Sequence, residues 1–173
     1  MTRYAAFLRG VNLGKRQVKS ADLLKAFTNM GFDNVKTLLA SGNVLFDADS
    51  PDARQIEAAL ERAFSFAIGT VLRSQDQLKA LIDLDPFDGR KEDENTKLYV
   101  TFVEDLNATS LPMPCAVTAD FEVVKLTDGE VCIVTYRKAD GRYGSGMDLI
   151  WKHYGKKRLW TSRNWNTVLK AAS

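Results

Sequence analysis

The stretch VKTLLASGNVLF, residues 35–46, decides the fold of the first half of this chain. Two mostly apolar runs, residues 35–40 and 44–46, flank a central Ser41-Gly42-Asn43. Glycine and asparagine tolerate the positive φ angles that the tight turns of β-hairpins require. We therefore predict two antiparallel strands joined by a short turn at residues 41–43.

The sequence on each side of this hairpin predicts one helix and one outer strand. Apolar residues recur at helical spacing within residues 20–31, before the hairpin, and again within residues 50–64 after it. Short apolar runs at residues 3–9 and 70–73 are typical of buried strands. The resulting order, βαββαβ, is the split-βαβ or ferredoxin-like arrangement.

The sequence of the second half of the chain predicts a related but less complete arrangement of strands and helices. Strands are expected at residues 97–103, 121–126 and 131–136, and helices from Ser145 and at the C-terminal end around Trp165. We therefore predict an α+β protein of two ferredoxin-like (split βαβ) subdomains, the second of them degenerate.

A charged segment is expected to separate the two subdomains. Residues 85–95 are rich in acidic side chains and contain Gly89, which is typical of a solvated connection. We therefore divide the chain into a first subdomain at residues 1–84, an acidic linker at 85–95 and a second subdomain at 96–173 with basic C-terminal helices.

Composition narrows the class of protein. A net charge of +2 gives no global field that marks a nucleic-acid or membrane binder. No uninterrupted apolar run is long enough to span a bilayer, and the N-terminus lacks the pattern of a signal peptide. Cys115 and Cys132 lie far apart, which argues against a disulfide framework or a zinc site. We expect a cytoplasmic protein with no membrane contact, no bound metal and no cofactor.

The predicted topology brings two conspicuous motifs to one edge of the first sheet. The first strand ends at Arg9-Gly10 and the second ends at the Ser41-Gly42-Asn43 turn. In a split βαβ unit these two strands run parallel, so their carboxyl ends share an edge, beside the N-terminus of the following helix. A helix N-terminus attracts anions. The candidate ligand-binding residues at this edge are Arg9, Asn12, Lys15, Arg16, Ser41 and Asn43.

A structural interpretation of the same edge stays open. Gly10 and Gly14 can serve only to permit tight turns, and Arg9 and Asn12 can serve to fasten the loop. The loop is not a nucleotide-triphosphatase P-loop, because three residues instead of four separate its glycines and Arg16 replaces the required Ser or Thr after the lysine.

A third motif, TSRNWNTV at residues 161–168, lies in a basic segment. Residues 137–173 hold nine basic and two acidic residues, together with all three tryptophans. Basic residues interleaved with aromatics are typical of grooves for single-stranded nucleic acid. Trp160, Arg163 and Asn166 are the candidate ligand-binding residues there. The alternative is that Thr161 or Asn164 caps the last helix and Trp165 packs in the core.

No recognisable catalytic constellation accompanies these motifs. His153 is the only histidine and lies among lysines, where a solvated helix end is its expected role. Neither cysteine lies in a nucleophile motif, and Ser41 lacks the glycine two residues earlier that a nucleophile elbow requires. Whether the protein is an enzyme stays open.

In this order, the opening loop at residues 7–14, the hairpin at 41–46 and the closing Arg-Asn-Trp-Asn at 163–166 resemble the bacterial domain-of-unknown-function family 1697 (DUF1697). The resemblance implies an α+β fold of two related subdomains and implies no activity. Three hypotheses follow: binding of a phosphate-bearing ligand, either single-stranded nucleic acid or a nucleotide; an enzyme acting on a small anionic metabolite in a cleft between subdomains; or a protein-interaction module with an exposed sheet face.

Overall fold

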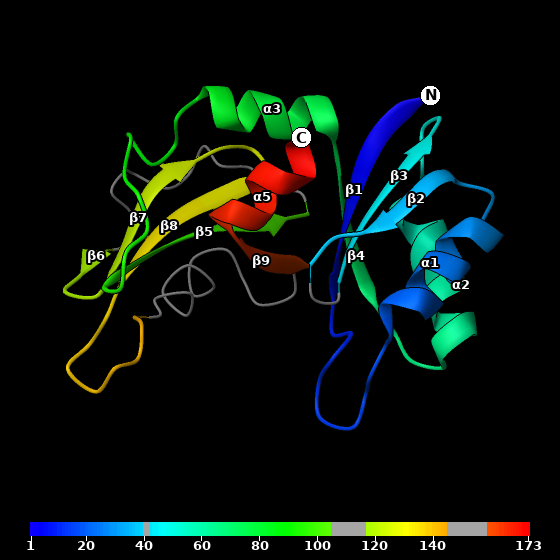
Figure 1. Cartoon of the computed structure of the whole chain (residues 1–173), viewed down its shortest axis with the longest axis horizontal. Coiled ribbons are helices and arrows are strands. Elements are labelled where there is room, and N and C mark those ends of the chain that lie inside the picture. The colour runs from blue at the N-terminus through cyan, green and yellow to red at the C-terminus, as the bar shows by residue number, and fades with distance from the viewer. Residues whose placement is uncertain (40–41, 105–116, 145–158) are drawn as a thin grey trace. The chain divides into compact units, whose positions relative to one another are not determined.

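The structure, a computed structural model, describes residues 1–39, 42–104, 117–144 and 159–173. It is a mixed α+β protein with two compact units (Figure 1). Unit 1 comprises Met1–Ala80 together with Leu169–Ser173, and unit 2 comprises Leu81–Val168.

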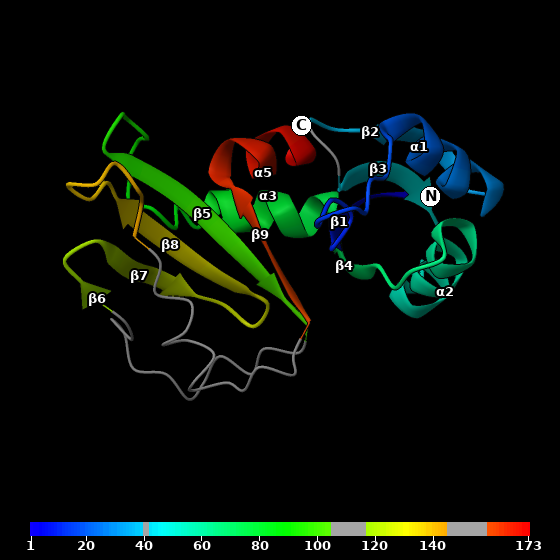
Figure 2. The same cartoon turned by 90° about the horizontal axis from the view of Figure 1, so that it is seen from below.

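Unit 1 contains a four-stranded antiparallel sheet with the strand order β2-β3-β1-β4. This is the order expected for a split βαβ fold, in which each crossover helix skips one strand. Figures 1 and 2 show α1 and α2 on the same face of the sheet. Its elements, in chain order, are β1 (Thr2–Arg9), α1 (Ser20–Asn29), β2 (Asp33–Thr37), β3 (Asn43–Ala48), α2 (Ala53–Phe64), β4 (Gly69–Ser74) and the start of α3 (Gln75–Asp83).

The core of unit 1 fills the space between this sheet and the two helices. Alternate residues of β1, among them Ala6 and Leu8, face the helices and are buried. Phe46 of β3 packs against Phe27 of α1 with ring centroids 5.4 Å apart, and against Phe32 at 4.4 Å. This apolar cluster fixes where β1 ends, and so it positions the loop that follows.

The other face of this sheet is also apolar and buried. Ala5 and Phe7 of β1, Leu45 of β3 and Val71 of β4 are at most 7% exposed.

Unit 2 contains a five-stranded antiparallel sheet with the order β6-β7-β8-β5-β9. Apart from the two-residue edge strand β6, its four long strands follow the same order by sequence as those of unit 1. The predicted fold of two ferredoxin-like subdomains is thereby confirmed. The elements are β5 (Thr96–Val103), β6 (Val117–Thr118), β7 (Phe121–Leu126), β8 (Glu130–Tyr136), β9 (Trp160–Asn164) and α5 (Trp165–Ala172). The helix predicted from Ser145 lies outside the described residues.

The compact units divide at a different place from the predicted subdomains. The division falls between Ala80 and Leu81 rather than within residues 85–95, and the last five residues group with unit 1. The Gln75 amide donates hydrogen bonds to the carbonyl oxygens of Ala172 and Ser173, both at 3.1 Å. The acidic segment groups with unit 2 and contains the buried Phe87.

Candidate functional site

The loop between β1 and α1 is held at both ends and exposed in the middle. Val11 and Val18 are buried in the core of unit 1, whereas all six residues between them are exposed. Inside the loop, the Asn12 side-chain oxygen accepts a hydrogen bond from the Val18 N–H at 3.1 Å. The Arg16 N–H donates to the Leu13 carbonyl at 3.0 Å. The loop thus has a defined shape while presenting its tip to solvent.

Both glycines of this loop adopt backbone angles that favour glycine. Gly10 has φ +79° and Gly14 has φ +59°, and no atom outside their immediate neighbours would obstruct a Cβ at Gly14. The requirement at Gly14 is therefore one of backbone conformation rather than of space. The glycines permit tight turns, as the structural interpretation predicted, and in doing so they shape the loop tip.

Positive charge dominates this loop. Residues 9–21 contain four basic side chains and no acidic one. Within the described part of the chain, the ammonium groups of Lys15 and Lys19 make no ion pair or hydrogen bond. Lys19 also stands at the N-cap of α1 without a side-chain capping bond. The Arg16 guanidinium lies 4.9 Å from the centre of the Phe66 ring, a cation–π contact that fixes its direction.

The hairpin motif meets this loop as the topology predicted. The Leu8 N–H donates to the Gly42 carbonyl at 2.8 Å, and Phe7 lies opposite Asn43 across the β1–β3 pair. Asn43 is buried, and its amide donates to the Leu38 carbonyl at 3.2 Å, so its side chain holds the hairpin closed. Ser41 lies outside the described residues.

The third motif lies in unit 2 and makes structural contacts there. The Asn164 side-chain oxygen accepts from the Asn166 N–H at 2.9 Å, which caps α5 as one of the two alternatives predicted. The side-chain amides of Asn164 and Asn166 both donate to the Glu92 carboxylate. The Trp165 ring meets Phe87 edge-on, with centroids 5.0 Å apart. Asn166 therefore has a partner in the fold that sequence reasoning missed.

Trp160 and Arg163 also have contacts within unit 2. Trp160 is half-buried and packs against the core formed by Val103, Phe121 and its neighbours. The Arg163 guanidinium donates to the Thr161 hydroxyl at 2.5 Å and to the Ser162 carbonyl at 2.9 Å. Burial lowers the pKa of Arg163 to about 10, so the side chain stays charged at neutral pH.

The predicted site residues thus form two groups, one in each unit. In unit 1, Arg9, Asn12, Lys15 and Arg16 lie at the end of β1 or in the loop after it, and the buried Asn43 lies opposite Phe7 in the neighbouring strand β3. In unit 2 the third motif binds Glu92, which lies in the segment predicted to be a linker. The sequence around Glu92 does not indicate that it binds the third motif, because its partners Asn164 and Asn166 follow more than 70 residues later.

Groups for nucleophilic or metal chemistry are sparse in the described residues. Burial raises the pKa of the Cys132 thiol to about 12, which opposes formation of a nucleophilic thiolate at neutral pH. Within residues 1–39, 42–104, 117–144 and 159–173, no cluster of three His, Cys, Asp or Glu is arranged to hold a metal ion. Cys115 and His153 lie outside those ranges. None of the helices in the same ranges has the length and apolarity needed to cross a bilayer.

Comparison with known proteins identifies a family and a structural neighbour. The family model described as "Protein of unknown function (DUF1697)" matches residues 1–131. The conserved bacterial protein SP0830 from Streptococcus pneumoniae has a similar structure, with 24% sequence identity and a TM-score of 0.63. That match covers 99% of this chain and 97% of the streptococcal chain. No curated protein matches this sequence.

Proposed function

This chain belongs to the DUF1697 family of proteins of unknown function, and we propose from its own residues that it binds a phosphate-bearing ligand. The binding site is the exposed loop at residues 9–19, and the ligand is a single-stranded nucleic acid or a nucleotide. The proposal rests on the conformation and charge of this loop, which is held by internal hydrogen bonds and contains four basic side chains and no acidic one. The ammonium groups of Lys15 and Lys19 have no partner among the described residues.

The structure of the loop supports this proposal over a solvated turn. A loop that only connects β1 to α1 needs neither buried valines at both ends nor the Asn12 bond across it. These features limit the conformational freedom of Lys15 and Arg16, so less entropy is lost when an anion binds. The uncapped N-terminus of α1 beside Lys19 adds backbone N–H donors to the same region.

The proposal assigns different roles to the other predicted site residues. Asn12 and Asn43 shape the loop and the hairpin, and Lys15, Arg16 and Lys19 meet the phosphate. The third motif is assigned to the fold of unit 2, because Asn164, Asn166 and Trp165 all have partners there.

A salt-dependent titration tests this proposal. Fluorescein-labelled single-stranded RNA is titrated with the protein, and its anisotropy is followed at several salt concentrations. We expect Lys15→Gln to weaken binding and to lower the slope of log K against log salt by about 0.7, the loss of one phosphate contact on a single strand. Lys25→Gln, which removes an exposed charge from α1 outside the loop, should leave both quantities unchanged.

The possible outcomes separate the two ligand classes. If RNA does not bind but a nucleoside triphosphate shifts the amide NMR signals of residues 9–19, the ligand is a nucleotide. If neither binds, or if Lys25→Gln weakens binding as much as Lys15→Gln, the loop is not a phosphate site.

We also propose that the protein works in the cytoplasm. The support is the cysteine pattern: Cys132 is a buried free thiol, as expected in a reducing compartment. Fractionation of cells that express the tagged full chain tests this location, and recovery in the periplasmic or external fraction would contradict it.

A further inference from the structure

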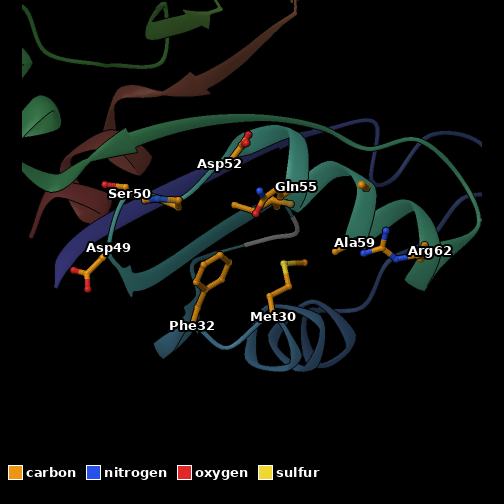
Figure 3. Close-up of a pocket in the computed structure, with 11 residues that line it drawn as sticks. Met30, Phe32, Asp49, Ser50, Asp52, Gln55, Ala59 and Arg62 are labelled. Atoms are coloured by element: carbon orange, nitrogen blue, oxygen red, sulfur yellow. The ribbon is translucent and has the colours of Figure 1, made fainter.

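A pocket of about 500 Å³ lies between the end of α1 and α2, and none of its lining residues belongs to the basic loop. It is formed wholly by unit 1. Figure 3 shows Met30 and Phe32 on one side pointing toward α2, which supplies Gln55, Ala59 and Arg62 on the other. Its volume lies within the range of about 300–1,000 Å³ typical of small-molecule sites.

Apolar and polar side chains both line this pocket, with the apolar ones gathered around Met30, Phe32 and Ile56. Met30 and Phe32 are half-buried, and Ile56 at the base is 1% exposed. On α2 the facing positions are alanines, Ala58 and Ala59, whose short side chains leave the space open. A methionine beside an aromatic ring gives a wall that adapts to the shape of an apolar ligand.

The acidic groups at the rim already have partners. The Asp49 carboxylate pairs with the N-terminal ammonium of Met1 at 3.4 Å. The Asp52 carboxylate accepts from the Arg54 N–H at 2.8 Å, as the N-cap of α2. Neither carboxylate is therefore the first choice for a cationic ligand.

The donors at the rim, in contrast, have no partner. The Gln55 amide and the Arg62 guanidinium make no hydrogen bond or ion pair with any described residue. With Ala59 between them, they lie four and three residues apart along α2, which places all three on one face of the helix. A planar guanidinium binds a carboxylate through two parallel hydrogen bonds.

We propose that this pocket, the α1–α2 pocket, binds a small monocarboxylate with an apolar body. The carboxylate binds Arg62, with Gln55 as a second donor, and the hydrocarbon body lies against Met30, Phe32 and Ile56. This site is separate from the phosphate-binding loop, and its existence does not depend on the proposed function.

Methyl NMR of methionine tests this proposal directly. The chain has four methionines, so ¹³C-methyl labelling gives few signals, and the variant Met30→Leu identifies the one from Met30. Titration with butanoate, hexanoate and octanoate should shift the Met30 methyl signal saturably. Each buried methylene should tighten binding about fourfold.

Three variants and one uncharged probe test whether Arg62 binds the carboxylate and whether the ligand lies in this pocket. Arg62→Gln should weaken octanoate binding about tenfold or more, whereas Arg54→Gln, an exposed arginine on the same helix outside the pocket, should not. Ala59→Leu should abolish binding by filling the pocket. Neutral 1-octanol should bind more weakly than octanoate.

Several results would overturn the proposal. One is a Met30 methyl signal that does not respond to octanoate. Others are equal affinities of Arg62→Gln and Arg54→Gln, or octanol binding as tightly as octanoate. Saturable binding that persists in Ala59→Leu, with the rest of the NMR spectrum unchanged, would place the ligand elsewhere.

Discussion

At the scale of single residues, Asp47 shows how one carboxylate joins three strands. The Arg3 guanidinium donates to one of its oxygens at 3.0 Å, and the Asn34 amide donates to the other at 2.7 Å. Arg3 also donates to the Asn34 carbonyl at 2.8 Å, so β1, β2 and β3 are tied at one point. The hydrogen bonds from Asn34 and Arg3 lower the pKa of Asp47 below its ordinary value of 3.8.

This lowered pKa predicts a pH-dependent contribution to stability. Because the folded protein holds Asp47 ionised more strongly than the unfolded chain does, the stabilisation is present above about pH 4. This stabilisation is lost as the pH falls through the lowered pKa of Asp47.

The variant Asp47→Asn tests this dependence. It should lower the free energy of unfolding by about 0.5–1 kcal/mol at pH 7, and the difference from the unchanged protein should shrink in acid. Urea unfolding of both proteins at pH 7 and below pH 3 measures this difference in the free energy of unfolding. The exposed Asp83→Asn is the control, and a pH-independent difference would show that the charge has no role.

Residue patterns predicted local contacts well where both partners are close in sequence. Ser74 and Gln77 have the Ser-x-x-Gln spacing of a capping box, and they form one at the start of α3, with reciprocal hydrogen bonds of 2.8 and 3.1 Å. Of the two predicted caps of the last helix, Asn164 is the one used. Trp160, a candidate ligand-binding residue by its sequence, starts β9 and packs against the core of unit 2. A strand as short as β9 shows too few alternations of apolar and polar residues to be recognised from the sequence.

At the scale of elements, the third motif joins α5 to the segment before β5. Glu92 also accepts from the Leu98 N–H at 2.9 Å, so the same carboxylate holds the start of β5 and the start of α5. The sequence alone does not predict that Glu92 pairs with Asn164, because the two residues are distant in sequence and only the tertiary fold brings them together.

Asn164→Ala should therefore destabilise unit 2 more than Asn166→Ala. The first change removes both the helix cap and a bond to Glu92, at a cost of about 1–2 kcal/mol. The second removes only a long, exposed 3.4 Å bond. Thermal unfolding compares the two variants, and equal shifts in melting temperature would contradict the role given to the cap.

At the scale of the whole molecule, the order of elements predicted the first sheet, because a βαββαβ order leaves few ways to pair the strands. Of the second sheet it predicted β5, β7 and β8, but not β6 or β9. The grouping of the last five residues with unit 1 depends on contacts between residues that are distant in sequence. Leu169–Ser173 returns to unit 1 through Gln75 and through the buried Ala171 and Ala172. The candidate loop was predictable from its glycines and charges, whereas the α1–α2 pocket arises from alanines that face apolar residues distant in sequence.

Truncation after Val168 should therefore destabilise unit 1, although the deleted residues lie at the far end of the chain. Two buried methyl groups at about 0.8 kcal/mol each and two hydrogen bonds at about 1 kcal/mol each predict a loss of about 3.6 kcal/mol. Hydrogen exchange of the β1 and β3 amides should accelerate accordingly. Removing Ser173 alone should cost only about 1 kcal/mol, because it removes one of these two hydrogen bonds, and unchanged exchange after the longer deletion would contradict the assignment of these residues.

The return of the last five residues to unit 1 bears on how the protein is made. Domains generally fold as units on the ribosome, the N-terminal one first. Here the N-terminal unit lacks Leu169–Ser173 until unit 2 has been synthesised, so the first unit is completed after the second has been made. During synthesis the nascent chain therefore carries a first unit whose Gln75 amide still lacks the two carbonyl partners that Ala172 and Ser173 provide in the folded protein.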